Sequence, residues 1–98
     1  MSVQIERGGI SAASATGSPV SIQGTFNLTV SGSFVATAVC ERSYDGGTSW
    51  APLAYPDGSP IVIGGPLSLA FEEPQRNVLY RMRALTWTAG ELAWRFSR

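Results

Sequence analysis

Residues 43–50 read SYDGGTSW, and this stretch is the most specific turn signal in the chain. Glycine takes positive φ angles at no steric cost, and an aspartate side chain can accept hydrogen bonds from amides of its own turn. Alternating runs flank the stretch, residues 33–42 before it and residues 50–55 after it. Asp-Gly-Gly between two such runs is typical of a β-hairpin. The stretch therefore predicts a hairpin that joins two strands.

The rest of the chain from Val20 onward alternates with a period of two, which is typical of half-buried strands. Pro52 cannot donate a ladder hydrogen bond, so the strand that contains it belongs at a sheet edge. Seven or eight short strands without a helix indicate a β-sandwich or small barrel. We expect a small antiparallel β-sandwich over residues 20–98. The expected strands are residues 20–22, 25–30, 34–41, 51–55, 67–72, 78–87 and 92–97, with 61–63 as a short strand or an apolar loop anchor.

Residues 78–87 and 92–97 are expected to pair as a final hairpin. The alternation places Val78, Tyr80, Met82 and Ala84 on one face and Leu79, Arg81, Arg83, Leu85 and Trp87 on the other. Arg95 would then lie beside Arg81, Arg83 and Trp87. This surface is either a solvated sheet face or an arginine–aromatic contact surface for a neighbouring subunit, since both residue types are enriched in interface anchors.

The first 19 residues differ in composition from the rest. Val3 and Ile5 alternate with polar neighbours as in a short edge strand, and residues 8–18 are almost entirely Gly, Ser, Ala and Thr. Such a composition is typical of a linker or tail. We therefore expect an N-terminal arm over residues 1–19, with Val3, Ile5 and Arg7 as candidate contacts to another subunit.

Composition limits the classes of partner. The chain has 98 residues, enough for one domain, with 14% charged residues and a formal net charge of zero. Little charge repulsion keeps copies apart, so we expect a homo-oligomer. All seven cations are arginine and are balanced by seven acids, which does not support nucleic-acid binding. No apolar run is long enough for a membrane span, and no signal-peptide pattern begins the chain.

Candidate catalytic and metal-binding residues are scarce. The chain contains no histidine, the commonest general base and metal ligand. Cys40 is the single cysteine and lies in an apolar run, which predicts a small buried side chain. Glu72 and Glu73 are interpreted as a solvated pair at a strand end. Asp45 and Asp57 lie in Gly-containing turns, where aspartate is common without calcium. We expect no enzyme, cofactor or metal site.

Residues 43–50 also match the Asp-box pattern Ser-x-Asp-x-Gly-x-Thr/Ser-Trp of sialidase-like propellers and many unrelated β proteins. The resemblance implies that Asp45 ties the turn, Gly47 takes a positive φ and Trp50 covers the hairpin. Propellers repeat the motif in each blade, but this chain has one copy. The motif is therefore interpreted as structural. Its turn residues are Ser43, Asp45, Gly46, Gly47 and Trp50.

A longer stretch, residues 24–50, resembles small virion proteins of tailed phages and prophages. In these compact β-sandwich proteins, Gly-Thr-Phe is followed by Val-x-Leu-Glu-Arg-Ser-Phe-Asp-Gly-Gly-x-Thr-Trp; here Cys40 replaces Leu and Tyr44 replaces Phe. The resemblance implies a non-enzymatic structural protein of the virion, most simply a capsid decoration protein bound to itself and to the major capsid protein or other virion proteins. A tail or head–tail connector component is the alternative.

Two other interpretations remain open. The run that begins at Tyr80 is similar to the penultimate strand of fibronectin type III and immunoglobulin-like domains, where a tyrosine hydroxyl caps a corner. Plain core packing is the alternative for Tyr80. Separately, Tyr44, Trp50 and Tyr55 could stack on sugars, which would make the chain a carbohydrate-binding module.

Overall fold

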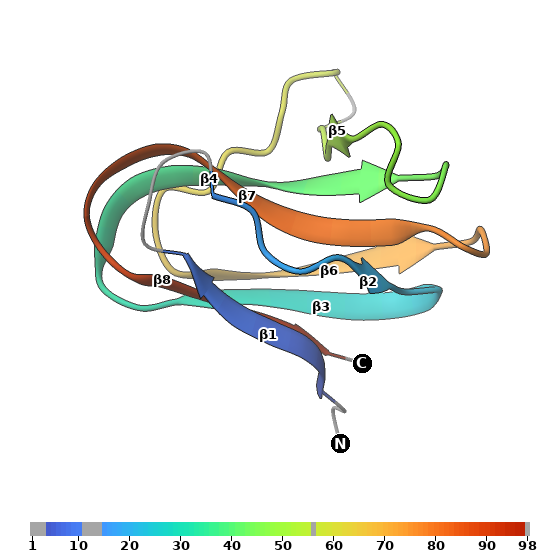
Figure 1. Cartoon of the computed structure of the whole chain (residues 1–98), viewed down its shortest axis with the longest axis horizontal. Coiled ribbons are helices and arrows are strands. Elements are labelled where there is room, and N and C mark those ends of the chain that lie inside the picture. Colours follow the sequence, from blue (N-terminus) through green and yellow to red (C-terminus); the bar gives the residue numbers. More distant parts are fainter. Residues whose placement is uncertain (1–3, 11–14, 56, 98) are drawn as a thin grey trace.

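The computed structural model describes residues 4–10, 15–55 and 57–97, with side chains from Arg7 onward. The described residues contain eight β-strands and no helix, and the strands form two four-stranded antiparallel sheets (Figure 1). The prediction of a small all-β antiparallel sandwich is confirmed. The strands are β1 (Gln4–Ile10), β2 (Val20–Ser21), β3 (Gly24–Ser31), β4 (Phe34–Ser43), β5 (Ala51–Pro52), β6 (Leu67–Glu73), β7 (Leu79–Gly90) and β8 (Leu92–Ser97).

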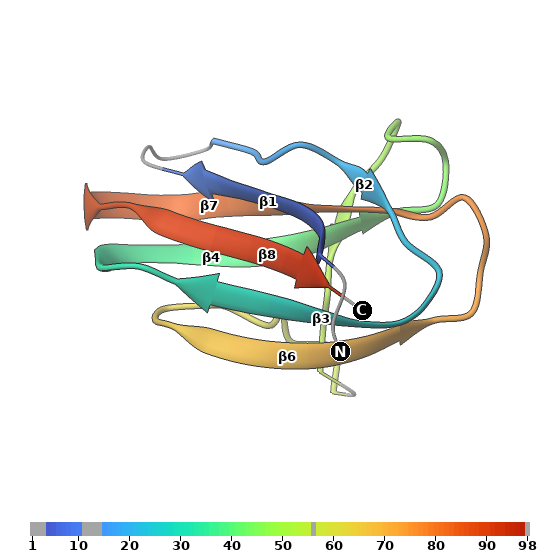
Figure 2. The same cartoon turned by 90° about the horizontal axis from the view of Figure 1, so that it is seen from below.

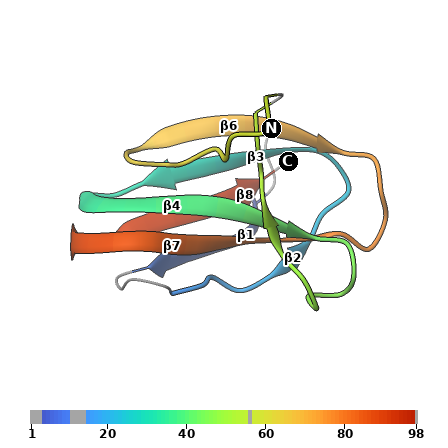
Figure 3. The same ribbon diagram turned by 90° about the horizontal axis from the view of Figure 1, so that it is seen from above.

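Sheet A has the strand order β1-β8-β3-β6, and sheet B has the order β2-β7-β4-β5 (Figures 2 and 3). The chain changes sheet repeatedly, and two of these connections are those between β3 and β4 and between β7 and β8. These two connections lie against each other, because the Glu91 amide donates to the Ser33 carbonyl at 3.1 Å. A Cβ on Gly90 would lie 2.1 Å from that carbonyl oxygen, and the φ of Gly90 is +89°. Only glycine fits this approach without a shift of the backbone.

The crossover after β7 corrects one prediction. Residues 78–87 and 92–97 do not form a hairpin, because β7 lies in sheet B and β8 in sheet A. Arg95 is therefore on the opposite sheet from Arg81 and Arg83. The turn residues between these two strands, 88–91, do not reveal whether the following strand pairs with the preceding one or crosses to the facing sheet.

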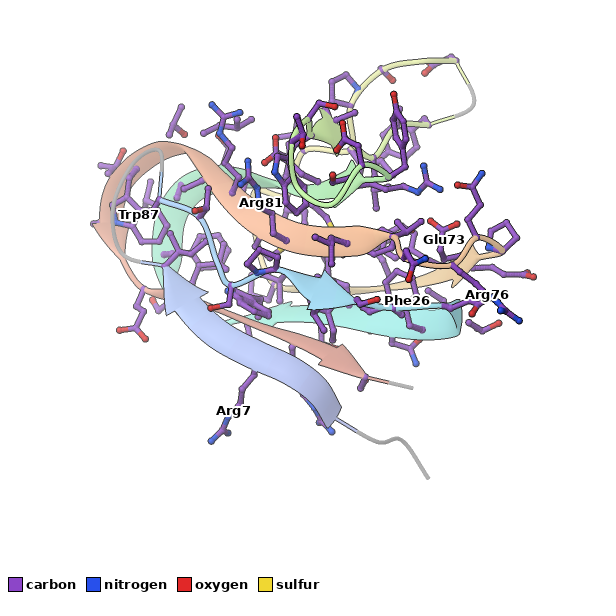
Figure 4. The ribbon with its side chains drawn as sticks, turned by 45° about the vertical axis from the view of Figure 1, so that its right-hand side comes forward. Arg7, Phe26, Glu73, Arg76, Arg81 and Trp87 are labelled. Atoms are coloured by element: carbon purple, nitrogen blue, oxygen red, sulfur yellow. The ribbon has the colours of Figure 1, made fainter. Side chains whose placement is uncertain are left out.

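The core lies between the sheets and is built from alternate residues of β3, β4, β7 and β8. Phe26 is fully buried at its centre (Figure 4). Its ring centroid lies 4.8 Å from that of Tyr80, 5.5 Å from that of Phe71 and 6.1 Å from that of Phe96. Burial of each such side chain stabilises the fold by about 1.5–3 kcal/mol. The contact between Phe26 and Tyr80 joins sheet A to sheet B, and the rings of Phe71 and Phe96 pack beside Phe26 from strands of the same sheet.

The stretch 43–50 forms the turn between β4 and β5. Asp45 Oδ1 accepts hydrogen bonds from the Ser43 hydroxyl at 2.7 Å and the Ser49 amide at 2.9 Å, and Oδ2 accepts one from the Ser49 hydroxyl. Both glycines of the turn have positive φ angles, 75° and 95°. Trp50 Nε1 donates to the Gly47 carbonyl at 3.1 Å. Asp45 thus ties the turn and Trp50 folds back over it.

Strand β7 contains a bulge at Leu85, an extra residue between two pairs with β4. A bulge reverses the alternation of faces beyond it. Trp87 consequently packs against the core and stacks with Phe34 at a centroid distance of 6.4 Å, near the end where the chain changes sheet (Figure 4). The prediction that Trp87 shares an outer face with Arg81 and Arg83 is wrong for this reason.

The described part of the N-terminal segment belongs to the sandwich. Strand β1 pairs with β8, and its last residue, Ile10, is 3% exposed and lies in the core. Further on, the Gly17 amide donates to the Met82 carbonyl at 2.8 Å, along β7 of the other sheet. The segment therefore supplies an edge to each sheet, and the expectation of a separate arm does not hold for these residues.

Close packing explains why small residues occur in this N-terminal segment. The Trp94 side chain lies in the core, and a Cβ added to Gly8 or Gly17 would lie 2.8 or 2.6 Å from its Cζ2 atom. No real side chain fits at such distances unless the indole moves. The absence of side chains at Gly8 and Gly17 thus makes room for Trp94, so the composition reflects close packing as well as turn formation.

Candidate functional site

Glu73, at the end of β6, forms a buried ionic cluster with Arg42 of β4 and Tyr80 of β7. The Arg42 guanidinium donates to both Glu73 oxygens, to Oε1 through Nε and to Oε2 through Nη2 at 3.0 Å. The Tyr80 hydroxyl donates to Oε1 at 2.8 Å, and the Gln75 amide donates to Oε2 at 3.0 Å. Glu72 is exposed, as predicted, but Glu73 is 1% exposed, so the prediction of a solvated pair is wrong for Glu73.

This cluster holds its carboxylate in the charged form. Hydrogen bonds from Arg42, from the Gln75 amide and from Tyr80 lower the pKa of Glu73 to about 2, although burial opposes them. Burial and the bond to Glu73 raise the pKa of the Tyr80 phenol. Every group therefore keeps one protonation state near neutral pH. The cluster joins sheet A to sheet B. The Tyr80 hydroxyl donates its hydrogen bond to the Glu73 carboxylate at this corner of the sandwich.

A second buried carboxylate, Glu41, lies under the outer surface of sheet B. Arg81 Nε donates to its Oε1 at 2.9 Å, and Arg83 Nη1 donates to its Oε2 at 3.4 Å. The guanidinium carbon of Arg81 also lies 4.0 Å from the ring centroid of Trp50. A cation–π contact of this kind contributes about 0.5–2 kcal/mol. Arg81 therefore holds the turn 43–50 against β7, and its guanidinium group is used in contacts with Glu41 and Trp50 of the same chain.

The predicted interface residues have different positions in the structure. Val3 lies outside the described residues, and Ile5 belongs to β1 without a described side chain. Trp87 packs against the core, and Arg81 is bound to Glu41 and Trp50. The Arg83 side chain remains 44% exposed above Glu41. Trp87 therefore does not share a surface with Arg81 and Arg83.

Arg7 and Arg95, by contrast, are brought together. They are register partners on the neighbouring strands β1 and β8, and Thr29 of β3 is the register partner of Arg95 on its other side. Both arginines are exposed on the outer face of sheet A, and Arg7 extends away from the sandwich (Figure 4). They line a depression of about 530 Å³ on this face. Its other polar side chains are Thr29, Ser31 and Glu91.

The depression has the chemistry of a contact site. Two guanidinium groups beside hydroxyl groups can bind carboxylates or other anions through charge-assisted, bidentate hydrogen bonds. Sequence reasoning named Arg7 and Arg95 separately and missed Thr29, Ser31 and Glu91. Their closeness depends on the strand order β1-β8-β3, for which the sequence carries no direct signal.

Cys40 and Asp57, two other residues considered for chemistry, have structural roles. Burial, and then the charge of Glu41, raises the pKa of the Cys40 thiol to about 12, so the buried thiol is a poor nucleophile. Asp57 accepts hydrogen bonds from the Ser59 amide at 2.9 Å and from its hydroxyl at 2.6 Å, which lower the pKa of Asp57. Within the described ranges, no three His, Cys, Asp or Glu residues gather as a metal site, and no helix is long and apolar enough to cross a membrane.

Comparison with known proteins adds no relative. No protein-family model, curated protein or solved structure matches the chain. Function is therefore inferred from the arrangement of the residues, together with the sequence resemblance of residues 24–50.

Proposed function

We propose that the protein is a non-enzymatic structural component of a tailed-phage or phage-like virion, where it decorates the capsid. The observation that carries this proposal is the depression on the outer face of sheet A, in which Arg7 and Arg95 face outward from neighbouring strands. Arg95 is exposed in this depression. An acidic segment of a shell protein could pair with its guanidinium group through charge-assisted hydrogen bonds, so this face is suited to a protein partner.

The rest of the molecule supports a role as a rigid adaptor. Glu41 and Glu73, the most buried acids among the described residues, form ion pairs within the chain. These ion pairs join β4 to β6 and β4 to β7, so the strands need little rearrangement when a partner binds. Modest contacts repeated over a symmetric shell add through effective concentration. Such a protein stabilises a particle without chemistry.

A tail or connector component would use the same surface and differs in its place on the particle. The second class of function is a carbohydrate-binding module. Tyr44 is 71% exposed at the turn after β4, and Tyr55 is 53% exposed in the following loop. Exposed aromatic rings are suited to stacking on sugars. Trp50, in contrast, is half-buried, and the Arg81 guanidinium group lies over its ring. Trp50 is therefore not one of the candidate sugar-binding residues.

The test is binding of the purified protein to phage-like particles from the source of the gene, after the resident copies have been stripped. We expect saturable co-sedimentation with heads, at a copy number comparable to that of the shell subunit. Arg95→Glu should weaken binding about tenfold or more, because it places an acid opposite the acidic partner. Arg76→Glu, a matched charge reversal at the exposed turn after β6 (Figure 4), should leave binding unchanged.

Each other outcome has a defined meaning. Binding to purified tails but not heads would favour the tail or connector alternative. No binding to any particle, with glycan-array binding lost in Tyr44→Ala or Tyr55→Ala, would favour the carbohydrate-binding module. Equal effects of Arg95→Glu and Arg76→Glu would exclude the depression as the contact site. Deletion of the N-terminal residues is not a suitable test, because it would remove β1 from sheet A.

A further inference from the structure

Strand β6 is an edge strand of sheet A that differs from the other edges of the sandwich. It pairs with β3 over seven consecutive register positions, from Gly24 opposite Glu73 to Val30 opposite Leu67, without a bulge. Within the described residues, no amide or carbonyl of β6 bonds to a loop or turn. Its second edge is thus a regular row of backbone donors and acceptors, the template on which another strand can pair.

The other three edges carry the features by which proteins block such pairing. Strand β1 has a register shift between Gln4 and Glu6. Strand β2 has only two residues, and β5 has two residues of which one is Pro52. Short strands, prolines within a strand and bulges protect edges from association. Only β6, of the four edges described, is long, regular and free of proline.

We infer that β6 pairs with β6 of a second copy of this chain, antiparallel about a two-fold axis at Ala70. This register pairs all seven residues of the strand, with Ala70 opposite itself and each other residue opposite its mirror position. On the outer face, Ser68 meets Glu72 of the second copy. On the inner face, Leu69 meets Phe71 of the second copy. Both are only half-buried in the single chain, so the pairing covers apolar surface that the sandwich leaves accessible.

Other registers are less suitable. A slip of one strand by one residue against the other would place the apolar inner face of one strand beside the polar outer face of the other. A two-fold axis at Leu69 or Phe71 keeps the faces matched but pairs only five of the seven residues of the strand. A two-fold axis at Glu72 would set two like charges directly opposite each other, which is destabilising. An axis at Ser68 would pair only the beginning of the strand. The side chains themselves therefore favour the axis at Ala70, which is isologous and closes as a dimer.

The neighbouring loop is consistent with an interface on this side. The chain between β5 and β6 reaches the same side of the sandwich as β6 (Figures 2 and 3). Tyr55 and Val62 of this loop are 53% and 48% exposed. A second copy aligned along β6 would lie next to this loop.

The test uses the outer-face position at the axis. Ala70 is exposed, so Ala70→Lys and Ala70→Glu leave the core intact, but each homodimer would set like charges face to face. Sedimentation equilibrium should show a concentration-dependent wild-type dimer and, for each variant alone, dimerisation weakened about fivefold or more. An equimolar mixture of the two variants should form a heterodimer about tenfold or more stronger than either homodimer. Thr25→Lys, on the same outer face but on the interior strand β3, is the matched control.

Every other result overturns the inference. A wild-type chain that stays monomeric into the millimolar range removes the dimer. A dimer that survives Ala70→Lys, or one that Thr25→Lys weakens equally, places the contact elsewhere. Loss of the dimer in both variants without recovery in the mixture excludes the register about Ala70. Circular dichroism of each variant establishes that the fold is retained. The measurement needs no particles, so its outcome is independent of the proposed capsid role.

Discussion

At the scale of single residues, the main feature is that buried carboxylates form ion pairs with arginines of the same chain. Glu41 and Glu73 are both nearly inaccessible to solvent, and each carboxylate binds at least one arginine. Removal of one partner from such a pair is costly because it leaves a charge without compensation in a poorly solvated place. Two of the arginines that the sequence presented as surface candidates, Arg81 and Arg83, therefore contribute to folding.

The Glu73 cluster gives a pH-dependent prediction. We expect Glu73→Gln to lower the free energy of unfolding by about 2 kcal/mol at neutral pH, since it removes charge-assisted hydrogen bonds. The folded-state pKa of Glu73 is about 2 and its ordinary value is 4.5. A carboxyl with a lowered pKa stabilises the fold above the unfolded value and loses that contribution as the pH falls through the folded value. The difference between wild type and variant should therefore be complete above pH 4.5 and close toward pH 2.

Urea unfolding at a series of pH values measures this difference. Glu72→Gln is the matched control, because it removes the same charge from the adjacent, exposed residue. Its stability should stay close to that of the wild type across the series. A Glu73→Gln difference that is unchanged by acidification would show that the cluster acts through packing and not through the charge of Glu73.

At the scale of elements, the turn 43–50 joins a central strand to a short edge strand. The residues after β5 stay against β4 through isolated backbone hydrogen bonds. The Leu53 amide donates to the Cys40 carbonyl, and the amides of Ile63 and Ala38 each donate to the carbonyl of the other. Ile63 is fully buried and forms a single β-bridge with Ala38. Residues 61–63 are therefore an apolar loop anchor and not a strand. The geometry of the turn thus decides how this whole edge of sheet B begins.

We expect Asp45→Ala to loosen the turn and lower the thermal midpoint by a few degrees. It removes the acceptor for Ser49 and Ser43, whose hydrogen bonds also lower the pKa of Asp45 to about 2. In NMR spectra, the Trp50 Nε1–H signal should shift and lose protection, because its bond to Gly47 depends on the turn. Asp57→Ala removes the same charge and a similar turn contact in the next loop, and should leave the Trp50 signal unchanged. Identical spectra for Asp45→Ala and wild type would contradict the role of Asp45.

At the scale of the whole molecule, the two sheets are joined by a chain that changes sheet repeatedly. The N-terminal residues participate in both sheets, first as β1 beside β8 and then along β7. Ile10 belongs to the same core cluster as Leu92 and Trp94. The sandwich is consequently complete only with this segment in place.

This arrangement predicts the cost of a substitution near the N-terminus. Ile10→Ala should lower the free energy of unfolding by about 3 kcal/mol, as expected for a truncation in the core. Val35→Ala, a truncation of an aliphatic residue that is 62% exposed, should change it by less than about 0.5 kcal/mol. Chemical denaturation monitored by tryptophan fluorescence measures both. An Ile10→Ala variant as stable as Val35→Ala would mean that the segment is a separable arm.

The sequence by itself determined the class of fold, most of the strands and the turn at residues 43–50. These features depend on local signals: a period of two in hydrophobicity, and a turn whose aspartate and glycines act within a few residues of each other. The tertiary structure decided which strands are neighbours, and through that the pairing of Arg7 with Arg95, the burial of Glu73 and the inward turn of Trp87. Each depends on strand order, on a crossover or on a bulge, which join residues far apart in the chain. A local pattern specifies the two faces of a strand, but only packing determines what each face meets.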